Sequence, residues 1–82
     1  MGPVVADVHR SLTNVRPSAE AIERIEKFRA TAKTLVDAIF AYVPESRERS
    51  LACTHLEETV MWGVKAICLY DPDAREIPIG EA

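Results

Sequence analysis

The stretch that decides the fold is residues 46–62, SRERSLACTHLEETVMW. It follows Pro44, and because the residue before a proline is disfavoured in the α region, we expect one helix to end there and another to begin. Ser46 is the expected N-cap of the second helix, and Glu48 suits the positive end of its dipole. The sequence therefore predicts a helix over residues 47–70.

Two apolar stripes run along this predicted helix. Each stripe follows the three-and-four spacing of a helical face, and the two lie on different sides. The first contains Cys53, Leu56, Val60, Val64 and Ile67, and the second contains Leu51, His55, Trp62, Ala66 and Leu69. A helix that is apolar on two sides needs two packing partners. Since a single core is thin in a chain of 82 residues, we expect oligomerisation to supply the missing burial.

The rest of the chain predicts the other half of a hairpin. Residues 4–12 read as a short helix, and residues 13–17 as a connector. Ser18 is a plausible N-cap for a long helix over residues 19–43, which a short connection joins to the helix that follows. The tail, residues 71–82, is expected to be extended or mobile. The predicted fold is one all-α domain, a short N-terminal helix plus a long antiparallel αα-hairpin, assembled as a homo-oligomer.

Composition excludes several broad classes of function. The net charge of −3 argues against binding of DNA or RNA polymers, which rests on many Lys and Arg side chains. No apolar run resembles a transmembrane helix or a signal peptide, so we expect a cytosolic protein without a membrane role. One region, residues 10–33, is nevertheless locally basic. It holds Arg10, Arg16, Arg24, Lys27, Arg29 and Lys33 against Glu20, Glu23 and Glu26.

The sequence contains no pattern typical of an active site. Cys53 and His55 are two positions apart on a helix and point to nearly opposite sides, which disfavours a metal site or a Cys–His nucleophile. Cys53 and Cys68 are fifteen positions apart on the same helix, too far for a disulfide. Three glycines are too few for a phosphate-binding loop. Periodicity and spacing alone predict an oligomeric helical hairpin that is not an enzyme and has no metal or cofactor.

A resemblance extends this interpretation. The run Pro44-x-Ser46-Arg47-Glu48-x-Ser50-x-Ala52-x-Thr54-x-Leu56-Glu57-x-x-x-Met61-Trp62 resembles the signature of a phage-encoded family of small helical-hairpin proteins. These are the anti-CBASS cyclic-oligonucleotide sponges, whose hairpin is shared with Thoeris anti-defence sponges. The signature covers about a fifth of the chain, and the layout of the two helices around the proline is similar over most of it.

This resemblance implies a function. It implies a homohexamer that binds cyclic nucleotide messengers in the cytoplasm of the infected host cell and withholds them from immune effectors without cleaving them. The implied ligands are of the cyclic GMP–AMP, cyclic diadenylate and cyclic triadenylate class. Because the chain lacks the extra β-rich domain of the Thoeris sponges, it is more similar to the anti-CBASS branch.

The resemblance also implies a cyclic dinucleotide site between protomers, formed by the N-terminal segment and the first long helix. Lys27 matches the family's phosphate-binding lysine by position, although taken alone it reads as a solvated surface lysine. The family's base-stacking aromatic falls at Leu12. Either His9 or Arg10 takes over the stacking, or the protein binds dinucleotides poorly.

A separate cyclic trinucleotide site is implied on a three-fold axis. Arg47, Ser50 and Thr54 stand at i, i+3 and i+7, so they line one side of the second helix near its positive end. Repeated around an axis, they would form a ring of donors for three phosphates. The alternative is that Arg47 pairs with a carboxylate and that Thr54 bonds back to the helix.

A second class of function remains open from the sequence. The chain could be a helical protein–protein interaction module, an adaptor or an antitoxin-like dimer, whose exposed apolar stripe docks a protein partner. Trp62 fits either hypothesis as an interface or core residue, and Glu57 and Glu58 read as structural partners for basic side chains.

Overall fold

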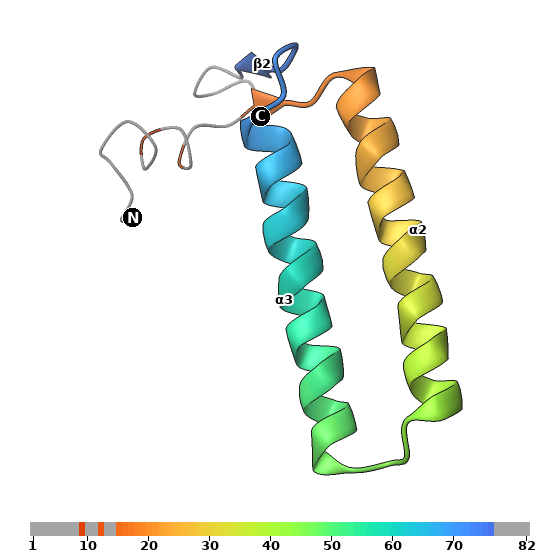
Figure 1. The fold of residues 1–82 in the computed structure, drawn as a ribbon. Helices are drawn as coiled ribbons and strands as arrows, with labels where there is room; N and C mark the ends of the chain where they lie inside the picture. The colour runs from red at the N-terminus through yellow and green to blue at the C-terminus, as the bar shows by residue number, and fades with distance from the viewer. Residues whose placement is uncertain (1–8, 10–11, 13–14, 77–82) are drawn as a thin grey trace.

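The computed structural model describes residues 9, 12 and 15–76, and its body is a pair of long antiparallel helices (Figure 1). The elements in chain order are β1 (Val15–Arg16), α2 (Ala19–Tyr42), α3 (Arg47–Leu69) and β2 (Arg75–Glu76). Residues 43–46 connect the two helices. The predicted αα-hairpin is confirmed, and each helix ends one residue before the position that the sequence suggests.

Both predicted N-caps are confirmed. The Ser18 side chain accepts a hydrogen bond from the Ala21 backbone N–H at 3.2 Å, and Ser46 accepts one from the Arg49 N–H at 3.1 Å. Each cap satisfies a backbone donor that the first helical turn leaves free. The caps therefore set the start of α2 and of α3.

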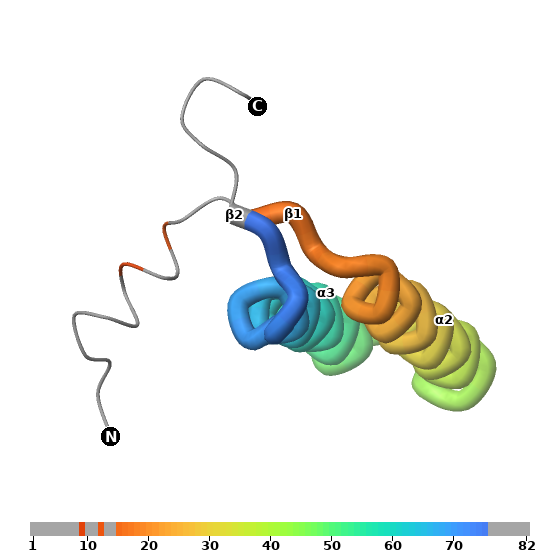
Figure 2. Tube along the Cα trace, turned by 90° about the horizontal axis from the view of Figure 1, so that it is seen from above, coloured from red at the N-terminus to blue at the C-terminus, as the bar shows by residue number. Residues whose placement is uncertain are grey.

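The connector and the tail add a small element that the all-α prediction does not contain. β1 and β2 pair antiparallel, with Val15 opposite Glu76 and Arg16 opposite Arg75. Because Arg16 precedes a proline, its backbone favours the extended region, and the chain enters β1 rather than continuing a helix. Figure 1 shows β2 at the end of the hairpin opposite the turn, and Figure 2, which looks along the helices, shows β1 beside β2.

The predicted N-terminal helix falls largely on residues that the structure does not describe. His9 and Leu12 have helical conformation. The other positions of the predicted helix over residues 4–12 lie outside the described residues, as does the end of the tail, residues 77–82.

The two apolar stripes of α3 have different environments. All five residues of the first stripe, Cys53, Leu56, Val60, Val64 and Ile67, are half-buried, whereas in the second stripe only Leu69 is, and Leu51, His55, Trp62 and Ala66 are exposed. The first stripe therefore faces α2, and most of the second faces away from it. Among the described residues, α3 therefore has α2 as a packing partner on one side and no long element on the other.

Close approach of the helices depends on Gly63. A Cβ atom placed there would lie 2.6 Å from Phe28 Cζ, well inside van der Waals contact. The half-buried Phe28 ring thus packs directly on the backbone of α3. A residue without a side chain at this position allows the aromatic ring of one helix to reach the other.

A single chain buries little of its apolar surface. Among the described residues, Ala21 and Ile25 are buried, while Trp62 is 61% exposed and Tyr42 is 85% exposed. The other exposed large apolar side chains are Leu12, Ile22, Leu35, Phe40, Leu51, Met61 and Tyr70. The radius of gyration is 16.1 Å, against about 12 Å for a compact chain of this length. In the part of the chain that the structure describes, no helix is long and apolar enough to cross a bilayer.

Candidate functional site

Side-chain hydrogen bonds between distant parts of the hairpin lie at its two ends, the turn between α2 and α3 and the open end opposite it. At the open end, Asp71 makes these hydrogen bonds. Its carboxylate accepts hydrogen bonds from Ser18, through the backbone N–H at 2.7 Å and through the hydroxyl at 3.0 Å. It also accepts from the Asp73 backbone N–H at 3.1 Å. One side chain just after α3 therefore ties down the start of α2, 53 residues away in sequence.

These contacts change the acidity of Asp71. The hydrogen bond from the Ser18 backbone lowers the pKa of Asp71 below its ordinary value of 3.8, partial desolvation opposes the change, and the Asp73 N–H and the positive charge of Arg24 add to the lowering. The first turn of α2 also presents its positive dipole end to this carboxylate. Asp71 is therefore held ionised at neutral pH.

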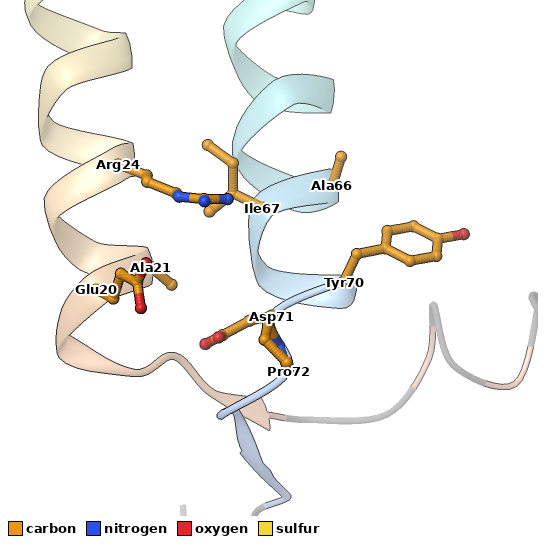
Figure 3. Close-up of a pocket in the computed structure, with 8 residues that line it drawn as sticks. All are labelled: Glu20, Ala21, Arg24, Ala66, Ile67, Tyr70, Asp71 and Pro72. Carbon is orange, nitrogen blue, oxygen red and sulfur yellow. The ribbon is translucent and has the colours of Figure 1, made fainter.

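An open pocket of about 330 Å3 lies beside Asp71 (Figure 3). Arg24 extends from α2 toward Ile67 of α3, and Tyr70 points away from α2. The pocket residues are Glu20, Ala21, Arg24, Ala66, Ile67, Tyr70, Asp71 and Pro72. The pocket combines one cation with two carboxylates, so its charge does not favour an anionic ligand.

The turn end is fixed by Arg49. Its guanidinium donates to the Val43 carbonyl at 3.4 Å and stacks over the Phe40 ring at 4.5 Å from the centroid. Val43 is the C-cap residue of α2, so the arginine satisfies a carbonyl at the negative end of that helix. These contacts hold the turn against both helices.

The three residues predicted for the trinucleotide site lie on one exposed side of α3. The Ser50 hydroxyl donates to the Ser46 carbonyl at 3.3 Å, and the Thr54 hydroxyl donates to the Ser50 carbonyl at 3.1 Å. Thr54 thus adopts the alternative arrangement, bonded back to its own helix. Arg47 is exposed and has no ion pair within the described part of the chain. Its guanidinium is available to an anion, whereas each hydroxyl would have to rotate to donate to one.

The residues predicted for the dinucleotide site lie on two different segments. Lys27 is on the outer side of α2 and pairs with Glu23 at 3.0 Å, both side chains being largely exposed. His9 and Leu12 precede β1, and Leu12 is 78% exposed. Arg10 lies outside the described residues.

A groove of about 450 Å3 runs between α2 and α3 on one face of the hairpin. Its apolar residues are Ala32, Val36, Phe40, Cys53, Leu56 and Val60, and its charged residues are Arg29, Lys33 and Glu57. Such a groove suits an apolar helix face or a flat base better than a phosphate.

Other polar groups on α3 make local contacts. Glu58 approaches His55 at 3.7 Å, and Lys65 lies 5.7 Å from the centre of the Trp62 ring. Cys53 and Cys68 are half-buried free thiols. Across residues 9, 12 and 15–76, no three His, Cys or carboxylate side chains come together in a way that could hold a metal ion.

The sequence did not identify three residues that shape the hairpin, one at each end and one between the helices. Asp71 appears in the sequence as part of a helix stop, and its bond to the Asp73 N–H is a local Asx turn, but its pairing with Ser18 has no local signal. A glycine inside a helical pattern, Gly63, could have indicated a close helix contact. A cation one turn into α3, Arg49, could have indicated a partner for the α2 C-terminus.

Comparison with known proteins gives one match. Residues 6–67 match the family model described as Acb2/Tad1, hairpin domain, which is more than half of the chain. Searches of curated proteins and of solved structures give no match. The matched region includes both long helices almost in full and ends before Asp71 and β2.

Proposed function

This chain belongs to the Acb2/Tad1 hairpin family, and we propose that it binds cyclic dinucleotide second messengers, cyclic trinucleotide second messengers or both, and sequesters them without cleavage. In this proposal it blocks CBASS-type antiphage signalling in the cytoplasm of the infected host cell. The observation that carries the proposal is the family match over residues 6–67, which agrees with the resemblance of the 44–62 signature to anti-defence sponges.

We assign trinucleotide binding to the turn end of the hairpin. Arg47 stands in the first turn of α3, where the helix dipole already favours negative charge. Ser50 and Thr54 follow it on the same side, and all three are exposed. An arginine with no carboxylate partner in the described chain is well suited to a phosphodiester, which it can contact through two N–H groups.

We assign dinucleotide binding to Lys27 together with His9, Arg10 and Leu12, supplied across an interface between protomers. The exposed Lys27–Glu23 pair can open at little cost, because surface ion pairs contribute less than about 1 kcal/mol. Lys27 would then neutralise one phosphate. The base would stack on His9 or Arg10, since Leu12 offers an apolar contact but no aromatic ring.

Assembly is part of the proposed function. The exposed aromatic and aliphatic side chains of α2 and α3 form more apolar surface than a small monomer usually leaves in water. A homohexamer would cover these side chains and bring the sites of different protomers together. A helical interaction module would use the same surface for a different protein, so ligand binding must separate the two functions.

Recovery of intact ligand tests the proposal. The purified protein is incubated with 3′,3′-cyclic GMP–AMP, cyclic diadenylate or cyclic triadenylate, separated from free ligand and heated to denature it. A sponge releases the bound nucleotide chemically intact. Degraded nucleotide would indicate an enzyme, and no retention of any of the three would favour the interaction module.

Two substitutions test the assignment of the sites. Because each removes a phosphate partner from a different site, Lys27→Ala should weaken cyclic dinucleotide binding and Arg47→Ala should weaken cyclic trinucleotide binding, each by about 10- to 100-fold. Calorimetric titration of both variants with both ligands measures the affinities.

Lys65→Ala is the matched control, since it removes an exposed cation of α3 that is assigned to neither site. It should bind both ligands as the unsubstituted protein does. If Lys27→Ala and Arg47→Ala also leave both affinities unchanged, the assignment of the sites is wrong even if the function is right.

A further inference from the structure

The strand pair places two arginines directly opposite each other. Arg16 of β1 and Arg75 of β2 are register partners in an antiparallel ladder. Directly opposite residues project their side chains from the same face, with Cβ atoms about 4.5–5.5 Å apart. Both arginines are exposed, and neither forms an ion pair within the described part of the chain.

This arrangement is unfavourable unless something negative lies near it. Like charges that face each other across a strand pair destabilise it, and a ladder of two residues has little stability of its own. The Asp71 carboxylate, four residues before Arg75, already accepts hydrogen bonds from Ser18 and from the Asp73 N–H. Neither guanidinium group has a carboxylate partner among the ion pairs of the described part of the chain.

The same contacts fix where the arginines stand. Ser18 is two residues after Arg16, and Asp71 is four residues before Arg75, so the Ser18–Asp71 hydrogen bonds close the ladder just beside the pair. The positions of both arginine backbones follow from the hairpin as a whole. The pair is thus held in place by contacts between distant segments rather than by local sequence.

We propose that Arg16 and Arg75 together bind one phosphate group, and that in this protein the group is a phosphodiester of the cyclic dinucleotide. The second part rests on the proposed function. Two planar guanidinium groups on one face can each donate two N–H groups to phosphate oxygens, which offsets their mutual repulsion. Arg75 lies outside the residues that match the family model.

The location of the Arg16–Arg75 pair favours the cyclic dinucleotide over the cyclic trinucleotide as its ligand. β1 follows the segment that holds His9 and Leu12, the side assigned to dinucleotide binding, and the pair lies at the open end of the hairpin. Arg47 lies at the opposite end, at the turn. A phosphate bound between Arg16 and Arg75 therefore belongs to a different ligand from one bound at Arg47.

Binding measurements on three variants test the inference. Arg16→Gln, Arg75→Gln and the double variant should each weaken 3′,3′-cyclic GMP–AMP binding by about 10- to 100-fold and leave cyclic triadenylate binding unchanged. Lys65→Gln removes the same charge elsewhere on the surface and should leave both affinities unchanged. If the unsubstituted protein binds the dinucleotide and the arginine variants bind it equally well, the inference is wrong and the proposed function stands.

A second measurement needs no cyclic nucleotide. At constant ionic strength and pH, inorganic phosphate should raise the thermal midpoint of the unsubstituted protein more than chloride does, and Arg75→Gln should abolish that difference. A phosphate-specific effect that Arg75→Gln removes, in a protein that retains no cyclic nucleotide, would support the anion site and overturn the proposed function. A phosphate effect that is equal in the two proteins would overturn the anion site.

Discussion

The two ends of the hairpin are held by different kinds of contact. At the turn, Ser46 caps α3 through Arg49 three residues away, and Arg49 reaches back to Val43, six residues away. At the open end, Ser18 and Asp71 are 53 residues apart, and a two-residue ladder joins segments that are even further apart in sequence. We therefore expect the turn to form early from local contacts and the open end to form after both helices are in place.

This difference separates the two proposed binding sites. The trinucleotide residues follow the locally determined turn, so their arrangement depends on little beyond α3 itself. Of the residues proposed for the dinucleotide site, His9 and Leu12 precede β1 at the open end, so we expect their arrangement to depend on the whole hairpin. Substitutions that weaken the long-range contacts at the open end should therefore lower the affinity for cyclic dinucleotides more than the affinity for cyclic trinucleotides.

The largest expected effect comes from the contact between the helices at Gly63. Alanine usually stabilises a helix by about 1 kcal/mol relative to glycine, but here its methyl group would overlap the Phe28 ring and cost about 1–3 kcal/mol. We expect Gly63→Ala to lower the thermal midpoint by several degrees, measured by circular dichroism. Combining it with Phe28→Leu should restore part of the loss, and a stabilised Gly63→Ala protein would contradict the close packing.

A smaller effect compares the two N-caps directly. Ser46→Ala should cost about 1 kcal/mol of unfolding free energy, the usual value for a lost cap. Ser18→Ala should cost more, because the Ser18 hydroxyl both accepts from the Ala21 N–H and donates to Asp71. Denaturant titrations of both variants measure the difference, and equal losses would show that the Ser18 hydroxyl contributes no more than a cap.

The smallest expected effect is on the loss of stability at acidic pH. Since hydrogen bonds from Ser18 lower the pKa of Asp71, its contribution to stability is fully present above about pH 3.8 and is lost as the pH falls through the lower value in the folded protein. The thermal midpoint of the unsubstituted protein should therefore fall more between pH 5 and pH 2.5 than that of Asp71→Asn. All other carboxylates are the same in both proteins, so the comparison isolates Asp71, and parallel curves would argue against a stabilising role for the ionised Asp71 carboxylate.

The sequence predicts those parts of the fold that are determined by residues close together in the chain. Pro44 breaks the helix by its effect on the preceding residue, and Ser18 and Ser46 cap the helices that start beside them. The three-and-four spacing around Leu56 predicts the face of α3 that lies against α2. Each of these signals acts within one or two turns of the chain.

The parts that the sequence does not predict depend on distant partners. Nothing near Asp71 indicates Ser18, and nothing near Arg75 indicates Arg16, because the hairpin must form before either pair can meet. The residues proposed to bind ligands also differ in whether local sequence predicts their arrangement. The helical face shared by Arg47 and Thr54 follows from spacing, whereas the neighbours of Lys27 in a ligand site would come from another protomer and stay a prediction.

The most direct test of the account is the mass of the native protein in solution with cyclic nucleotide present, measured by native mass spectrometry after removal of free ligand. We expect a homohexamer that carries unmodified cyclic dinucleotide or trinucleotide. A monomer that carries none of 3′,3′-cyclic GMP–AMP, cyclic diadenylate and cyclic triadenylate would contradict it.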